Sequence, residues 1–236
     1  MTPLLTSAAA RAHVTSADLL AGHDTLVVVA PHPDDETLGC GALLHEAGAA
    51  GMQCRVICMT DGSASHPESR RWPRERLADL RRAELESALS LLASHAELHW
   101  LGYPDCGLPT PNEDPLCSRA LDALVPEGAL VLSAWSGDPH IDHQMTADLV
   151  SSALHHRRGV RRLAYPIWGR FERGPAPAGM AVVGSAPEVR EIKRRALGQH
   201  ASQMTRLIDD DPGGFVMSDD VQAHFVDHPE IFHAEA

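Results

Sequence analysis

The chain has 236 residues, of which 44% are hydrophobic, and its formal net charge is −12. This composition is typical of a folded globular protein and excludes an intrinsically disordered chain. The acidic charge argues against nucleic acid and anionic membrane as main partners, because both carry negative charge themselves.

The N-terminal segment MTPLLTSAAARAHVTSADLLAG lacks a basic region followed by a long apolar run. We therefore expect neither a signal peptide nor an integral membrane segment. The five cysteines form no CxxC pair and their number is odd. This usage predicts a reduced, cytoplasmic protein.

Strand and helix patterns alternate along the chain. The β-branched run TLVVVA at 25–30 predicts a strand buried on both faces. The first half is then expected to contain a helix over 36–50, a strand over 53–59, a helix over 72–93 and a short strand at 97–100. The second half predicts a helix over 116–124, a strand at 129–134, a helix ending near 157, strands at 162–167 and 180–184, and a helix over 187–204. The remaining C-terminal segment is expected to wrap over the domain surface.

This alternation predicts an α/β fold, because repeated strand–helix–strand units form parallel sheets with helices on both faces. We expect a Rossmann-like, largely parallel sheet in a single domain covering residues 1–236. In such sheets, ligands bind beyond the carboxyl ends of the strands.

Two clusters of histidines and carboxylates follow strands of the predicted sheet. PHPDDE, at 31–36, comes directly after the first strand, and DPHIDH, at 138–143, follows the strand at 129–134. His32 and Asp35 are three residues apart across a helix start, so both can point the same way. His140 and His143 have the same spacing.

Two imidazoles and one carboxylate are the ligand set of a catalytic zinc site, which leaves a position for water. The same set suits iron. Taken singly, Asp34 or Asp35 could cap a helix, and His143 could be an ordinary packed histidine. Two such clusters at strand ends together favour a metal site. A phosphate loop is excluded because no GxxxxGK[ST] or GxGxxG follows the first strand, and no GxSxG marks a serine hydrolase.

The paired segments PHPDDETLGCGALL and DPHIDHQ closely resemble the zinc-dependent N-deacetylases of the PIG-L (LmbE-like) family. Further matching segments extend the resemblance over roughly 24–204. They are TDG at 60–62, RRAEL at 81–85, LGYPDCGL at 101–108 and KRRALGQHASQ at 193–203.

The resemblance implies a role for each residue of the two clusters. His32, Asp35 and His143 would bind zinc. Asp34 would be the general base that takes a proton from the attacking water. A protonated His140 would stabilise the oxyanion and give a proton to the leaving amine.

The resemblance also implies supporting residues. Asp142 would orient one of the imidazoles, Arg81 would contact the substrate, and Glu36 would cap or orient the loop. The small residues of GCGALL, at 39–44, are expected to pack the following helix against the sheet.

The implied reaction is zinc-dependent removal of the N-acetyl group from an N-acetylglucosamine-type sugar conjugate, with a small-molecule substrate as partner. The alternatives are an amidase of another N-acyl or thiol conjugate, and a non-catalytic sugar-binding member of the fold. The loop 103–115 and the segment 165–171 could form pocket walls or simply pack. Tyr103, Trp135 and Trp168 are candidates to stack on a sugar. The sequence leaves the oligomeric state open.

Overall fold

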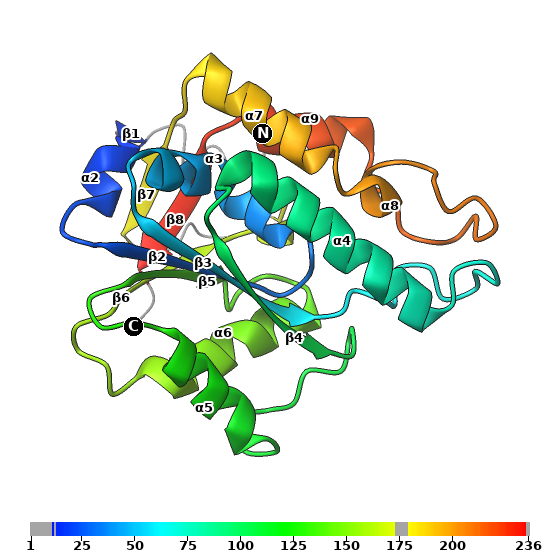
Figure 1. Cartoon of the computed structure of the whole chain (residues 1–236), viewed down its shortest axis with the longest axis horizontal. Coiled ribbons are helices and arrows are strands. Elements are labelled where there is room, and N and C mark those ends of the chain that lie inside the picture. The colour runs from blue at the N-terminus through cyan, green and yellow to red at the C-terminus, as the bar shows by residue number, and fades with distance from the viewer. Residues whose placement is uncertain (1–10, 12, 173–178, 235–236) are drawn as a thin grey trace.

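A computed structural model describes the protein at residue 11 and over residues 13–172 and 179–234. The described strands form one eight-stranded sheet in the order β1-β7-β8-β6-β5-β2-β3-β4 (Figure 1). They are β1 (His13–Val14), β2 (Thr25–Ala30), β3 (Gln53–Thr60), β4 (Glu97–Tyr103), β5 (Leu130–Ala134), β6 (Arg161–Tyr165), β7 (Met180–Val183) and β8 (Glu230–Ala234). From β2 the chain builds the sheet in one direction through β3 and β4, and in the other through β5 and β6. This switch opens a crevice at the carboxyl ends of β2 and β5.

The sheet is largely parallel, as predicted. Every pairing between described strands is parallel except those of β8, which runs antiparallel to β6 and β7. The register aligns Val29 of β2 with Ser133 of β5, so the two strands end side by side. The segments that follow them therefore emerge at the same place.

Helices cover both faces of the sheet, which also confirms the prediction (Figure 1). Leu26 and Val28 point toward one layer of helices, whereas Val27 and Val29 point toward the other. The first layer contains α3 (Asp35–Ala49), α4 (Arg74–Leu92), α7 (Pro187–Leu197) and α9 (Asp219–Asp227), and the second contains α5 (Pro115–Leu124) and α6 (Ile141–Leu154). Short pieces complete the described chain: α2 (Ser16–Leu20), the 3₁₀ turn η1 (Trp168–Arg170) and α8 (Ala201–Met204). No helix among the described residues is long and apolar enough to cross a membrane.

The predicted packing of the small residues in GCGALL is also observed. A Cβ at Gly39 would lie 2.4 Å from Cδ2 of Tyr165 on β6, which is closer than real carbon atoms approach. Glycine at this position therefore lets α3 lie directly against the sheet.

The C-terminal part differs from the prediction in two respects. The expected helix over 187–204 stops at Leu197 and restarts as the short helix α8. The C-terminal segment does not merely wrap the surface, because β8 inserts between β6 and β7 inside the sheet. Its strand pattern is concealed by Glu230 and His233, two polar residues that are nevertheless buried.

Glu230 is buried because its carboxylate bonds to the backbone of α3. It accepts the N–H groups of Ala42 and Leu43, at 2.8 and 3.0 Å. Nζ of Lys193, on α7, donates to Glu230 at 2.7 Å and to the carbonyl oxygen of Leu38 at 2.9 Å. One buried ion pair thus fastens β8 and α7 to the middle of α3.

Replacing Lys193 by methionine is expected to lower the free energy of unfolding by about 3–5 kcal/mol, because the carboxylate of Glu230 stays buried without its counter-charge. Urea unfolding would measure the change. Because the two sites interact directly, the loss in a Lys193→Met, Glu230→Gln double variant should be smaller than the sum of the two single losses. A single-variant loss near zero would contradict this account of how the C-terminal strand is held.

Candidate functional site

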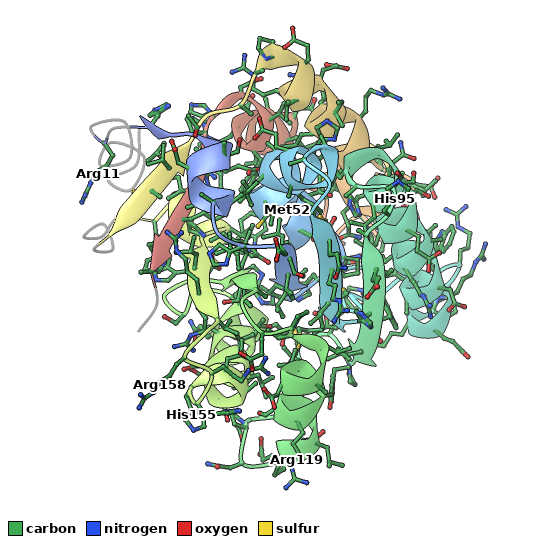
Figure 2. All side chains as sticks on the ribbon, turned by 60° about the vertical axis from the view of Figure 1, so that its left-hand side comes forward. Arg11, Met52, His95, Arg119, His155 and Arg158 are labelled. Carbon is green, nitrogen blue, oxygen red and sulfur yellow. The ribbon has the colours of Figure 1, made fainter. Side chains whose placement is uncertain are left out.

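A pocket of about 520 Å³ lies at the carboxyl ends of the parallel strands, where β2 and β5 end. It is lined by His32, Asp34, Asp35, Leu38, Ala64, Ser65, Pro67, Arg81, Asp105, Cys106, His140, Trp168, Gln203, Gly213, Phe215 and Met217. A second hollow of similar volume lies near the amino ends of β3 and β4, and its lining includes Met52 and His95. Both residues are labelled in Figure 2. The first pocket contains residues of both predicted clusters, so we call it the site pocket.

The structure brings both clusters together around the carboxylate of Asp35, the first residue of α3. Oδ2 of Asp35 lies 3.2 Å from Nδ1 of His32 and 3.3 Å from Nε2 of His143. It also accepts the backbone N–H of His32 at 2.9 Å. The ring of His140 lies 4.7 Å from that of His32 and 5.0 Å from that of His143, measured between ring centroids.

These donors fit a bound metal ion. Nε2 of His143 is buried, and its 3.3 Å contact with Asp35 Oδ2 lacks hydrogen-bond geometry, which leaves this nitrogen without a hydrogen bond in the described part of the chain. Ligands bound at about 2.0–2.2 Å around a tetrahedral zinc lie about 3.4 Å from one another. The distances from Asp35 to His32 and His143 are close to that value. One nitrogen each of His32, His140 and His143 also lies within 4.8 Å of the others. The cluster can therefore hold a metal ion.

Carboxylates contact the far side of both imidazoles that meet Asp35. Nε2 of His32 lies 3.0 Å from Asp142 Oδ2 and 3.3 Å from Asp105 Oδ1. Nδ1 of His143 lies 3.2 Å from Asp138 Oδ1. Metal-binding histidines usually contact a carboxylate through the nitrogen that faces away from the metal. This arrangement is therefore a second feature of the structure that fits a metal site.

The carboxylates around His143 give the site a negative electrostatic potential. Burial disfavours a charged His143 ring, but Asp35 and Asp138 oppose burial and raise the pKa of His143 to about 9. Carboxylates that stabilise a proton on His143 also favour a metal cation at the same place.

The sequence had indicated Asp142 but not the roles of Asp105 and Asp138. Asp138 is fully buried, and its Oδ2 accepts the backbone N–H groups of Ile167 and Gly169, both at 3.0 Å. Asp105 lies in the loop after β4 and is held there by a bond from its N–H to Asp61. The acidic residues within DPHIDH and YPDCG were the only signals in the sequence, because the partners lie far away along the chain.

Replacing Asp138 by asparagine is expected to weaken zinc binding by about 10–100-fold, the usual effect of losing a partner that orients a metal ligand. The groups that contact the carboxylate of Asp138 are backbone N–H donors and the His143 ring, so an amide NH₂ cannot replace a carboxylate oxygen there. Competition against a chelator would measure the affinity. Asp148→Asn, at an exposed position of α6, is the matched control, and equal affinities in the two variants would contradict the role of Asp138.

Asp34 lies beside the cluster but is held differently. It occupies the N-cap position of α3, yet its side chain makes no capping hydrogen bond, which rules out the simple capping interpretation. Its φ is +145°, a conformation that is costly for a residue with a side chain. Oδ2 of Asp34 accepts from Arg81 at 3.1 Å, and Oδ1 has no hydrogen bond among the described residues. Burial raises the pKa of Asp34 to about 6, although Arg81 opposes the shift.

His140 is held at the start of α6 through one ring nitrogen. Its Nδ1 accepts the backbone N–H of Asp142 at 3.2 Å, so that nitrogen carries no proton while the bond exists. Burial and the charges of His32 and His143 lower the pKa of His140. These effects work against the protonated His140 that the resemblance implies. The bond from the N–H of Asp142 favours the neutral tautomer with its proton on Nε2.

Arg81 and the aromatic candidates are placed as follows. Arg81 lines the site pocket but is only 3% exposed, and it donates to the carbonyl oxygens of Pro33 and Gly62 as well as to Asp34.

Trp168 lines the pocket, with its ring 5.8 Å from that of Phe215. Trp135 packs against Gly137 and Gly169 and does not line the pocket. Tyr103 donates its hydroxyl to Asp114.

Fold and site together define an α/β protein with a metal-binding cluster of histidines and aspartates at the switch point of its sheet. The chain matches the family described as PIG-L: GlcNAc-PI de-N-acetylase over residues 27–154, more than half of its length. That range includes both clusters. The chain belongs to this family, and the resemblance drawn from the motifs is confirmed.

Named relatives include deacetylases of sugar conjugates. The 1D-myo-inositol 2-acetamido-2-deoxy-alpha-D-glucopyranoside deacetylase of Mycobacterium avium (strain 104) is 35% identical over 129 residues, which are 49% of this chain and 42% of that protein. The probable N-acetyl-alpha-D-glucosaminyl L-malate deacetylase 2 of Bacillus anthracis is 27% identical over 193 residues, which are 77% of this chain and 84% of that protein. The chain spans about half the length, or less, of the first curated relatives that it matches.

The fold also has solved counterparts. The conserved protein TT1542 from Thermus thermophilus is 25% identical and superimposes with a TM-score of 0.63, covering 91% of this chain and 95% of that one.

Proposed function

We propose that the chain is a metal-dependent hydrolase that removes the acetyl group from an N-acetylglucosamine-type conjugate, giving acetate and a free amino sugar. The observation that carries the proposal is that two neighbouring carboxylates, those of Asp35 and Asp34, make different contacts. Asp35 contacts both His32 and His143, whereas Asp34 is turned to Arg81, and its other oxygen has no hydrogen bond among the residues that the structure describes. The family membership and the names of the relatives support the same reaction.

In this proposal His32, Asp35 and His143 hold Zn²⁺, with Fe²⁺ as the alternative for the same donors. When bound, the metal polarises the amide carbonyl and lowers the pKa of water at this position to about 7. Asp142 and Asp105 fix the ring of His32, and Asp138 fixes that of His143.

The remaining steps belong to the protein's own side chains. Oδ1 of Asp34 accepts a proton from the water that attacks the acetyl carbon. Nε2–H of His140 donates a hydrogen bond to the carbonyl oxygen as it becomes negative. Asp34 then gives its proton to the amine nitrogen as the C–N bond breaks. In this proposal His140 is neutral and acts as a hydrogen-bond donor, because burial and the neighbouring histidines lower its pKa. Asp34 is then the source of the leaving group's proton.

The substrate in this proposal is a small molecule whose sugar ring lies against the aromatic wall of Trp168 and Phe215. Arg81 supports Asp34 rather than the sugar, since its buried guanidinium already has three protein partners. We further propose that residues 1–236 act as one domain in the cytoplasm, where the five cysteines, all free, would stay reduced.

The test is an assay of the zinc-loaded protein on a panel of N-acetylglucosaminyl conjugates with neutral, anionic and cationic aglycones. Release of acetate and free amine in equal amounts is expected for at least one conjugate. Amide cleavage confined to other N-acyl or thiol conjugates would favour the amidase alternative. Zinc binding without any hydrolysis would leave a sugar-binding role.

A further inference from the structure

The backbone of Asp34 needs support from its neighbours, since its φ of +145° is costly. Two groups supply that support. Oε2 of Glu36 accepts the N–H of Asp34 at 3.0 Å, and Arg81 donates to the carbonyl oxygen of Pro33 at 2.8 Å. The direction of the Asp34 carboxylate therefore depends on where the side chain of Glu36 is held.

Glu36 is fully buried, so its other oxygen also requires partners. Oε1 of Glu36 accepts the hydroxyl of Thr37. Nε2 of His200 lies 3.3 Å from the same oxygen and 3.4 Å from the Thr37 hydroxyl. His200 precedes α8, far along the chain, so the C-terminal part of the fold reaches the PHPDDE segment at this point.

Within the described part of the chain, the imidazole of His200 has no polar contact other than those with Glu36 and Thr37. The ring is fully buried, and its Nδ1 has no hydrogen-bond partner among the described residues. All described polar contacts of the ring run through Nε2, toward Glu36 and Thr37. A histidine needed only to anchor α8 would not have to point there.

The anchoring of α8 is in fact carried by a neighbouring residue. Ser202 donates its N–H and its hydroxyl to Glu84 of α4, at 2.8 and 2.6 Å. These bonds do not involve Glu36. Ser202 therefore holds the short helix α8, whereas His200 contacts the carboxylate of Glu36.

We propose that His200 is a positioning residue of the active site. It fixes Glu36, which fixes the backbone of Asp34 and so aims the Asp34 carboxylate. The proposal rests on the deacetylase function proposed above.

Three substitutions test the proposal. The amide N–H of glutamine can occupy the position of Nε2 of histidine, whereas the shorter asparagine places its amide at the position of Nδ1. His200→Asn is expected to lower kcat by about 100-fold with little change in KM, the size expected for a misplaced catalytic group. His200→Gln should keep kcat near that of the wild type. Ser202→Ala, the matched control on α8, should lower Tm while kcat stays unchanged. Metal content by elemental analysis should equal that of the wild type in all three variants.

Several outcomes would overturn the proposal: equal kcat losses in the Asn and Gln variants, an unchanged kcat in His200→Asn, or loss of metal from that variant. Thr37→Val keeps the test open should His200→Asn fail to fold, since it removes another donor to the same oxygen without touching α8. A loss of kcat of about tenfold is expected there, smaller than the roughly 10²-fold cost of a fully misplaced group, and wild-type turnover would count against the chain of contacts. A wild-type protein that releases no acetate would instead reject the proposed function.

Discussion

Asp34→Asn is expected to reduce turnover by about 10³-fold, within the range that a general base contributes, while zinc stays bound. Asparagine suits the position because it tolerates positive φ better than most residues and its carbonyl oxygen can still accept from Arg81. What it cannot do is take a proton from water. The contacts between Asp35 and the two histidines, which are the proposed metal ligands, do not involve Asp34 and should survive.

The measurement is acetate release under saturating substrate, with metal content determined on the same samples. Asp18→Asn is the matched control, since it makes the same chemical change in an exposed capping box at α2. Turnover within a few-fold of the wild type in Asp34→Asn would remove Asp34 as the base. Loss of metal from the variant would instead place Asp34 among the ligands.

The sequence could predict the features of the fold that depend on local pattern. Uninterrupted apolar β-branched runs such as 25–30 are typical of strands buried on both sides, and the alternation with helices then predicts the parallel sheet. The position of the site followed from the same reasoning, since both clusters come directly after strands. Residue spacing alone could not show that the two clusters meet. The pairing of β2 with β5 shows this, because it places the two strand ends next to each other.

The parts that the sequence could not predict depend on partners far apart in the chain. The sequence of β8 looks too polar for a buried strand because it contains Glu230. That carboxylate can be buried only because Lys193, 37 residues earlier, pairs with it. Asp138 and Asp105 resemble ordinary loop acids until His143 and His32 are seen beside them. His200 lies in the segment KRRALGQHASQ, which resembles the family, but that resemblance gave the histidine no role.

These distant partners have a common effect on the site. In the described structure His32 is fixed by Asp105 and Asp142, and His143 is fixed by Asp138. Asp34 is fixed by Arg81 on α4. Side chains held in this way lose little freedom when a metal or substrate binds, so the site is preorganised by the fold.

His143→Ala is expected to weaken zinc binding by more than about 100-fold, which exceeds the usual effect of losing an orienting partner, and to abolish measurable turnover. His143 is fully buried, and its Nε2 lies beside Asp35. Its removal takes away one proposed ligand of the metal and leaves Asp35 and Asp138 without the ring that lies between them. His155→Ala, exposed at the end of the same helix, is the matched control.

Thermal unfolding with and without a chelator separates the two consequences of that substitution. A metal that binds only the folded state stabilises it by RT ln(1 + [L]/Kd), which is about 2.7 kcal/mol at a concentration about 100 times Kd. The wild type and His155→Ala should therefore lose several degrees of Tm when zinc is removed. His143→Ala should start from a lower Tm and show at most a small further loss, because a more than 100-fold weaker affinity leaves it at most about half occupied at that concentration. A chelator-dependent drop of normal size in His143→Ala would mean that the metal is held by other donors, and the ring nitrogens of His32 and His140 would be the first to examine.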